Sequence, residues 1–100
     1  MLYEVAVLPR ARRQIAEARD WWDLNRVAAP ALLRDEIDRA LDRISGSPKV
    51  GTPWPLREGV RRLVLARIGF ILLYRVRERA RRVEVLALWH GRRGHPPPGL

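Results

Sequence analysis

The feature of this 100-residue chain that most constrains its fold is an alternation of apolar and polar side chains between Val60 and Arg93. Three segments joined by short turns follow this period of two, which is typical of β-strands with one strongly buried face. Gly69 marks the first turn, and the charged run Arg77 to Arg82 carries the second. The residues expected to share a face are Leu63 and Leu65, then Phe70, Leu72, Tyr74 and Val76, then Val83, Val85, Ala87 and Trp89.

The N-terminal half must supply the cover that such a sheet needs. Leu2 to Leu8 alternates and predicts another strand, which Pro9 ends. Proline suits the first turn of a helix, because its missing N–H would be unpaired there in any case. The apolar positions that follow step by three and four residues, as on one face of a helix. They are Ala11, Ile15, Ala18 and Trp22 in a helix ending near Asn25, and Leu33, Ile37, Ala40, Leu41 and Ile44 in a second helix between Pro30 and Gly46.

The stretch from Ser47 to Gly59, which contains three prolines and two glycines, is expected to be a loop. The sequence therefore predicts an α+β fold in the order β-α-α-β-β-β, with a mostly antiparallel sheet and a helical hairpin packed on one face. Residues 1–93 are expected to form one domain, and residues 94–100, rich in Gly and Pro, a flexible tail.

Composition excludes several classes of protein. With no cysteine there can be no disulfide or thiolate metal site, and two histidines argue against a structural metal. No Gly-rich phosphate loop is visible, so no cofactor is expected. The chain also lacks an apolar run of membrane-spanning length and the basic-then-apolar order of a signal peptide. These features are compatible with the cytoplasm.

The charge points to the kind of partner. Nineteen arginines and one lysine against 11 acidic residues give a net charge of +9. Such an excess predicts attraction to nucleic acid, to an acidic protein segment, or to both.

One ordered set of segments in this sequence resembles a known protein family. It consists of the helices with Trp21, Trp22 and ALLRDEIDRALDRI, the loop with Pro48 and Gly51, and the strands beginning VRRL (Val60), GFILLYRV (Gly69) and VEVLALWHGRR (Val83). This set, spread from about Tyr3 to Pro97, resembles the RelE/ParE-type toxins of bacterial type II toxin–antitoxin pairs. The resemblance implies a neutralising antitoxin. We expect a small acidic protein that lays a helix or strand along the domain.

The resemblance also implies one of two activities. RelE-like toxins are metal-free ribonucleases that cut mRNA in the ribosome, using basic side chains and a tyrosine near the C-terminus. ParE-like toxins poison DNA gyrase by binding. The strand positions that match the nuclease's basic residues are Arg62, Val64 and Ile71, of which only the first is basic. Because Val64 and Ile71 can neither move a proton nor bind phosphate, the sequence favours the ParE-like branch.

Two further readings stay open. A nuclease would have to use Arg62, His90, Arg92, Arg93 and His95; no tyrosine follows the last strand, and the tail offers only His95 among prolines. A plain basic interaction module, or a toxin relic without activity, is the third hypothesis, and expression that leaves growth unaffected would favour it.

The candidate interface residues come from the strands and the first helix. Neighbouring strand residues point to opposite faces, so only one of Arg61 and Arg62 can lie on the uncovered face of the sheet. Trp22 continues the apolar stripe of its helix, whereas Trp21 lies at its edge, where it either packs on the second helix, which we favour, or anchors a partner. The residues expected to bind a target or partner are Arg61, Arg62, Arg75, Arg92, Arg93 and Trp21.

Overall fold

The computed structural model describes residues 2–93 and confirms the predicted α+β order. One short strand is added inside the segment that was expected to be entirely loop. The elements are β1 (Glu4–Val7), α1 (Pro9–Asn25), α2 (Leu32–Gly46), β2 (Thr52–Pro53), β3 (Val60–Leu65), β4 (Phe70–Arg77), β5 (Arg82–His90) and the 3-10 helix η1 (Gly91–Arg93). The predicted tail, residues 94–100, lies outside the described residues.

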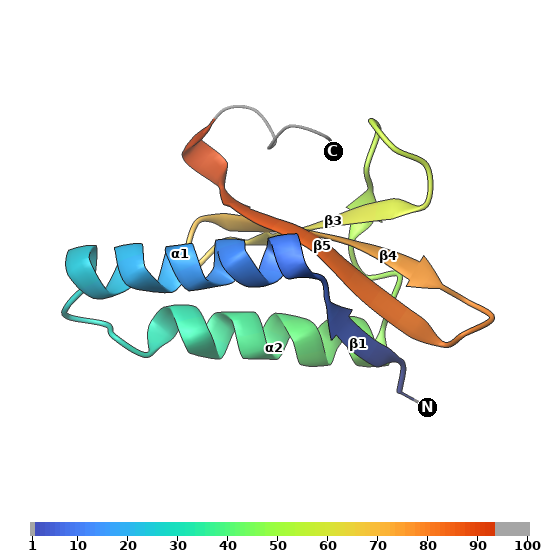
Figure 1. Cartoon of the computed structure of the whole chain (residues 1–100), viewed down its shortest axis with the longest axis horizontal. Helices are drawn as coiled ribbons and strands as arrows, with labels where there is room; N and C mark the ends of the chain where they lie inside the picture. Colours follow the sequence, from blue (N-terminus) through green and yellow to red (C-terminus); the bar gives the residue numbers. More distant parts are fainter. Residues whose placement is uncertain (1, 94–100) are drawn as a thin grey trace.

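The strands form one five-stranded sheet in the order β1-β5-β4-β3-β2. Consecutive strands from β2 to β5 pair antiparallel, and β1 pairs parallel with β5, which brings the N-terminal strand beside the last one. The hairpin of α1 and α2 packs on one face of this sheet (Figure 1). Within residues 2–93, neither helix has the length and apolar character needed to cross a membrane.

The helix boundaries follow local chemistry. Pro9 occupies the first turn of α1, as expected. Pro30, by contrast, lies in the turn before α2, which begins at Leu32. The indole Nε1 of Trp22 donates a hydrogen bond to the carbonyl oxygen of Ala29, at 2.8 Å. This bond ties the end of α1 to the interhelical turn and gives the polar atom of the buried Trp22 ring a partner.

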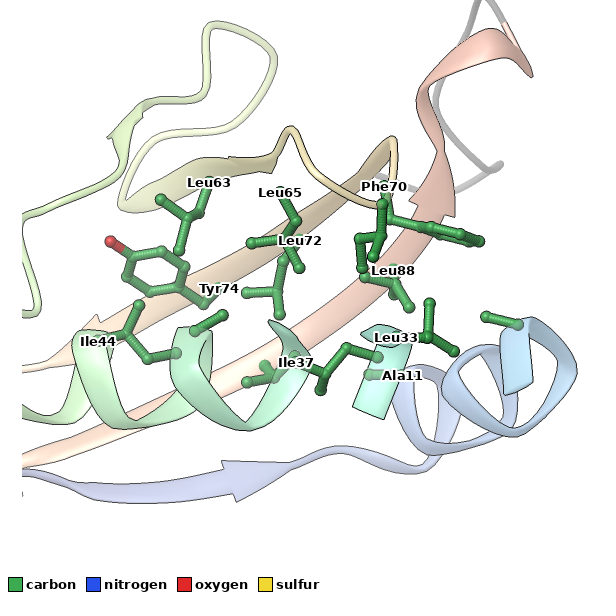
Figure 2. Close-up of a cluster of buried hydrophobic side chains, with 14 of the residues drawn as sticks. Ala11, Leu33, Ile37, Ile44, Leu63, Leu65, Phe70, Leu72, Tyr74 and Leu88 are labelled. Carbon is green, nitrogen blue, oxygen red and sulfur yellow. The ribbon is translucent and has the colours of Figure 1, made fainter. Parts of the chain in front are cut away.

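The main core lies between the helical hairpin and the sheet (Figure 2). Ile37 and Ile44 of α2 face Leu72 and Tyr74 of β4 there. The Tyr74 ring is fully buried, so its hydroxyl group needs partners inside the protein. It donates to the carbonyl oxygen of Pro48 at 2.7 Å and accepts from the N–H of Gly51 at 2.8 Å. Burial raises the pKa of Tyr74 above its ordinary value.

The face predicted for Ala87 and Trp89 is wrong, and a β-bulge in β5 is the reason. Leu73 pairs with Ala87 but Tyr74 pairs with Val85, so Leu86 has no opposite residue on β4. The extra residue reverses the alternation of β5 at this point. Ala87 and Trp89 consequently lie on the face opposite to Val83 and Val85, and Leu88 joins the helix-side core instead.

A second apolar cluster therefore occupies the other face of the sheet, which we call the outer face. The sequence predicted one strongly buried face, whereas the structure has apolar residues buried on both. The members of the outer cluster are Trp54, Val60, Leu73, Leu86, Ala87 and Trp89. Trp54 reaches this face from the 54–59 loop, and its ring meets that of Trp89 edge to face, with 5.9 Å between centroids.

We expect Tyr74→Phe to lower the free energy of unfolding by about 1–3 kcal/mol, because the buried N–H of Gly51 and the part-buried carbonyl of Pro48 lose their shared partner. Urea unfolding measures this change. Tyr3→Phe is the matched control, since the Tyr3 hydroxyl group donates to Glu78 at an exposed site where water can replace it. Equal losses in the two variants would contradict the role assigned to Tyr74.

Candidate functional site

The outer face carries Arg62, Val64 and Ile71, the three positions that were expected, from the resemblance, to correspond to basic residues of the nuclease. Val64 pairs with Ile71 across β3 and β4, and Arg62 pairs with Leu73. The Val64 side chain is 54% exposed, so a solvent-accessible apolar spot stands where two basic residues would be required. The guanidinium carbon of Arg62 lies 6.0 Å from the centroid of the Trp54 ring, within reach of a cation–π interaction. Of the three, Arg62 alone can bind an anion.

Arg61 points to the other face, as adjacent strand residues must. Its Nη1 atom donates to the carbonyl oxygens of Gly51 at 2.7 Å and of Lys49 at 3.3 Å. Arg61 thus holds the loop before β2 against the sheet. Of the two neighbouring arginines, Arg62 is the exposed one.

Arg75 is also engaged inside the protein. Its Nε atom donates to Oε1 of Glu84 at 2.6 Å, and Arg77 and Arg82 lie 3.2 Å and 3.7 Å from the same carboxylate. The Glu84 side chain is only 12% exposed, and its hydrogen bond to Arg75, followed by that to Arg77, lowers the pKa of the carboxyl group. Three cations around one anion leave this end of the sheet positive.

A pocket of about 480 Å³ opens between the C-terminal half of α1 and the end of β5. His90 is one of the residues that line this pocket. The imidazole ring lies 6.0 Å from that of Trp21 and 5.1 Å from that of Phe70, and Nδ1 accepts the N–H of Arg92 at 3.1 Å. Since Nδ1 is an acceptor, the neutral ring carries its proton on Nε2. The pocket is lined by Gln14, Glu17, Ala18, Trp21, Arg26, Phe70, Leu88, Trp89, His90 and Arg92.

Trp21 belongs to this pocket rather than to the interface with α2 that the sequence analysis favoured. The ring is 41% exposed and packs beside His90 at the end of β5. The guanidinium carbon of Arg26 lies 5.4 Å from the centroid of the same ring. An exposed tryptophan held between an arginine and a histidine is well placed to contact a partner.

The residues proposed for a nuclease are not all brought together. Arg62 lies on the outer face, whereas His90 lies on the helix side of the sheet, because the bulge has reversed the alternation of β5. His90 and Arg92 are neighbours in the pocket. Arg93 is the last residue of η1, and His95 lies outside the described residues. Residues 2–93 contain no group of three or more His, Asp or Glu side chains that could hold a metal ion.

Two pocket residues, Gln14 and Arg26, were missed by reasoning from the sequence. Gln14 falls between Ala11 and Ala18 at helical spacing, so a polar residue at a position on the buried stripe was the available signal. Its Oε1 atom accepts the backbone N–H of Leu88 at 2.9 Å. Arg26 gave no such signal, since it follows the end of α1 in a short break.

Comparison with known proteins places this architecture. The chain superimposes on a chain of the toxin–antitoxin complex RelBE2 from Mycobacterium tuberculosis with a TM-score of 0.66 and 26% identity, covering 90% of this chain and 92% of that one. For the chromosomal ParDE system of P. aeruginosa the TM-score is 0.70 at 17% identity, with coverages of 89% and 96%. For isolated E. coli RelE the values are 0.62, 18%, 88% and 83%. Among curated proteins there is no match.

These likenesses define the fold as that of the RelE/ParE toxins. A family model described as the ParE toxin of the type II toxin–antitoxin system, parDE, matches residues 5–94. The chain therefore belongs to the ParE toxin family of type II toxin–antitoxin systems, and the resemblance seen in the sequence is confirmed.

The arginines around Glu84 make the stability of the folded protein depend on pH. The pKa of Glu84 is lowered in the folded protein, so its contribution to stability is present above the unfolded value, about 4.3, and is lost as the pH falls through the folded value. We expect Glu84→Gln to lower the urea midpoint at pH 7, and its difference from the wild type to shrink as the pH falls through the lowered pKa of Glu84. Glu58→Gln, at an exposed position of the 54–59 loop, is the control. A Glu84→Gln deficit that stays constant throughout the acid range would rule out this account.

Proposed function

We propose that this toxin, a single domain of residues 1–93, inhibits DNA gyrase in the cytoplasm by binding it, and that a cognate acidic antitoxin neutralises it. The proposed action requires no cofactor and no bond breaking by the toxin. Trp21, Arg62 and Arg92, all exposed, are the side chains that we assign to contact with the target or the antitoxin. Arg61 and Arg75 support them from within, through the loop and the Glu84 cluster.

The observation that carries this proposal is the apolar character of the outer face at Val64 and Ile71. Metal-free RNA cleavage requires a base for the 2′-hydroxyl group, a cation for the phosphate and a donor for the leaving oxygen. Two paired aliphatic side chains supply none of these. Arg62, the one cation among the three positions Arg62, Val64 and Ile71, is separated by the sheet from His90, the nearest candidate base.

A ribosome-dependent endonuclease is the second candidate, and one observation favours it. His90 and Arg92 lie together in the pocket beside Arg26, so an imidazole and two guanidinium groups could meet a phosphate there. Cleavage of ribosome-bound mRNA by the wild type, lost in Arg92→Ala, would establish this candidate. We expect mRNA to remain intact with both proteins.

The direct test of the first candidate is a supercoiling assay with purified gyrase. We expect the toxin to stop supercoiling and trap cleaved DNA, and Trp21→Ala to be about tenfold or more weaker, because exposed aromatic anchors dominate interface energies. Leu56→Ala is the matched control, since it truncates another apolar side chain that is 63% exposed. Undiminished supercoiling at an excess of folded wild-type toxin would refute the gyrase assignment.

A further inference from the structure

Strand β5 pairs with β1 along only about half of its length. β1 pairs with Arg82 to Val85 of β5 and ends at Val7. The last contact is the hydrogen bond from the N–H of Leu8 to the carbonyl oxygen of Val85, at 3.1 Å. The chain then turns into α1 at Pro9. Within residues 2–93, no strand pairs with residues 86–90 of β5 on this edge, while β4 pairs with residues 87–90 on the other edge.

The direction of the backbone groups on this edge can be worked out. The N–H of Leu88 is bound by the Gln14 side chain, so it points away from β4. The N–H of Gly91 donates to the carbonyl oxygen of Gly69 at 2.8 Å, on the β4 side. Because these groups alternate along an antiparallel strand, the carbonyl group of Leu88 and both backbone groups of His90 point toward α1.

The pocket described above lies along this same edge. Its helical wall consists of Gln14, Glu17, Ala18 and Trp21, spaced by three and four residues on one face of α1, and its other wall is the end of β5. The side chain of Ala18 is small, so it leaves space between the two walls. Gln14 binds the edge at Leu88 by a single side-chain hydrogen bond.

We propose that this pocket is a slot for one strand of the antitoxin, which pairs with residues 86–90 of β5 and displaces Gln14 from the N–H of Leu88. The proposal rests on the proposed function in so far as it takes the occupant to be the antitoxin. Addition of an extended segment to an exposed sheet edge is a common way to bind a peptide, because backbone hydrogen bonds supply the affinity. A segment of about five residues, at ~3.3 Å each, spans this edge.

The chemistry of the slot describes the strand that fits it. On the inner side, Trp21, Phe70 and Leu88 offer apolar contact to one side chain of the incoming strand. Around the rim, Arg26 and Arg92 outnumber Glu17. We therefore assign to the antitoxin an extended segment in which an apolar residue is flanked by acidic ones, in keeping with a partner for a chain of net charge +9.

A variant at Gln14 can distinguish an antitoxin strand that pairs with β5 from an antitoxin that contacts only the side chain of Gln14. A strand would replace the amide oxygen of Gln14 by a backbone carbonyl group, so Gln14→Ala removes a competitor for the edge. We expect this variant to bind the antitoxin as tightly as the wild type, or more tightly. If Gln14 itself contacted the antitoxin, its removal would weaken the complex.

The experiment co-expresses the full chain with a small acidic protein from a neighbouring gene, as the candidate antitoxin, and follows amide hydrogen exchange. In the free Gln14→Ala chain, the Leu88 amide should exchange faster than in the wild type. In the complex, the amides of Leu88 and His90 should both become protected, by about a hundredfold or more, in the wild type and in the variant. A stable complex without protection at these two amides would overturn the slot while leaving the toxin assignment intact. Failure of any complex to form would count against the proposed antitoxin pairing itself.

Charge reversal on the rim gives an independent readout. Arg26→Glu combined with Arg92→Glu should weaken the complex about tenfold or more, because both arginines would face acidic side chains. The matched control is Arg34→Glu combined with Arg39→Glu, which changes the net charge equally on exposed positions of α2. Equal weakening by the two pairs would indicate general attraction and overturn the rim assignment, as would dimerisation of the free toxin through the same amides.

Discussion

One extra residue in β5 determines which side chains at the end of this strand face the helices and which lie on the outer face. Because Leu86 has no partner on β4, the strand changes which of its side chains face the helices. Leu88 enters the helix-side core, Trp89 meets Trp54 on the outer face, and His90 comes to lie beside Trp21 of α1. Without the bulge, His90 would share the outer face with Arg62, so an imidazole and a guanidinium group would lie on the same side of the sheet. The bulge thus separates groups that a hydrolytic mechanism would have to bring together.

The arginines of this chain fall into two groups, one that makes hydrogen bonds within the protein and one that is exposed. Arg61 secures a loop through two carbonyl oxygens, and Arg75 is the main partner of Glu84. Arg62 and Arg26 rest on tryptophan rings, with their charge still accessible. A surface of this kind attracts acidic partners at long range and selects among them by aromatic contacts at short range. That division suits a protein that acts by docking.

Much of the fold could be predicted from the sequence, because two periodicities carry it. The stripe Ala11, Ile15, Ala18 and Trp22 admits one placement on its helix, and the period of two placed Phe70, Leu72, Tyr74 and Val76 on the correct face. The run Val85 to Trp89 could not be resolved in this way, since five apolar residues in succession fit either face and conceal a bulge. Pairing of β1 with β5 depends on contacts between the two ends of the chain. The pocket was beyond reach for the same reason, because Trp21 and His90 meet only after folding.

The most direct test of this account is a set of side-chain proton–proton contacts measured by NMR in the free protein. The bulge requires contacts from the Trp89 indole to Trp54 and from the Leu88 methyl groups to the apolar residues beneath the helices. It also requires contacts between the rings of His90 and Trp21. Contacts from Trp89 to the helices, together with Leu88 and His90 on the side of Trp54, would show an unbroken alternation along β5 and contradict the account.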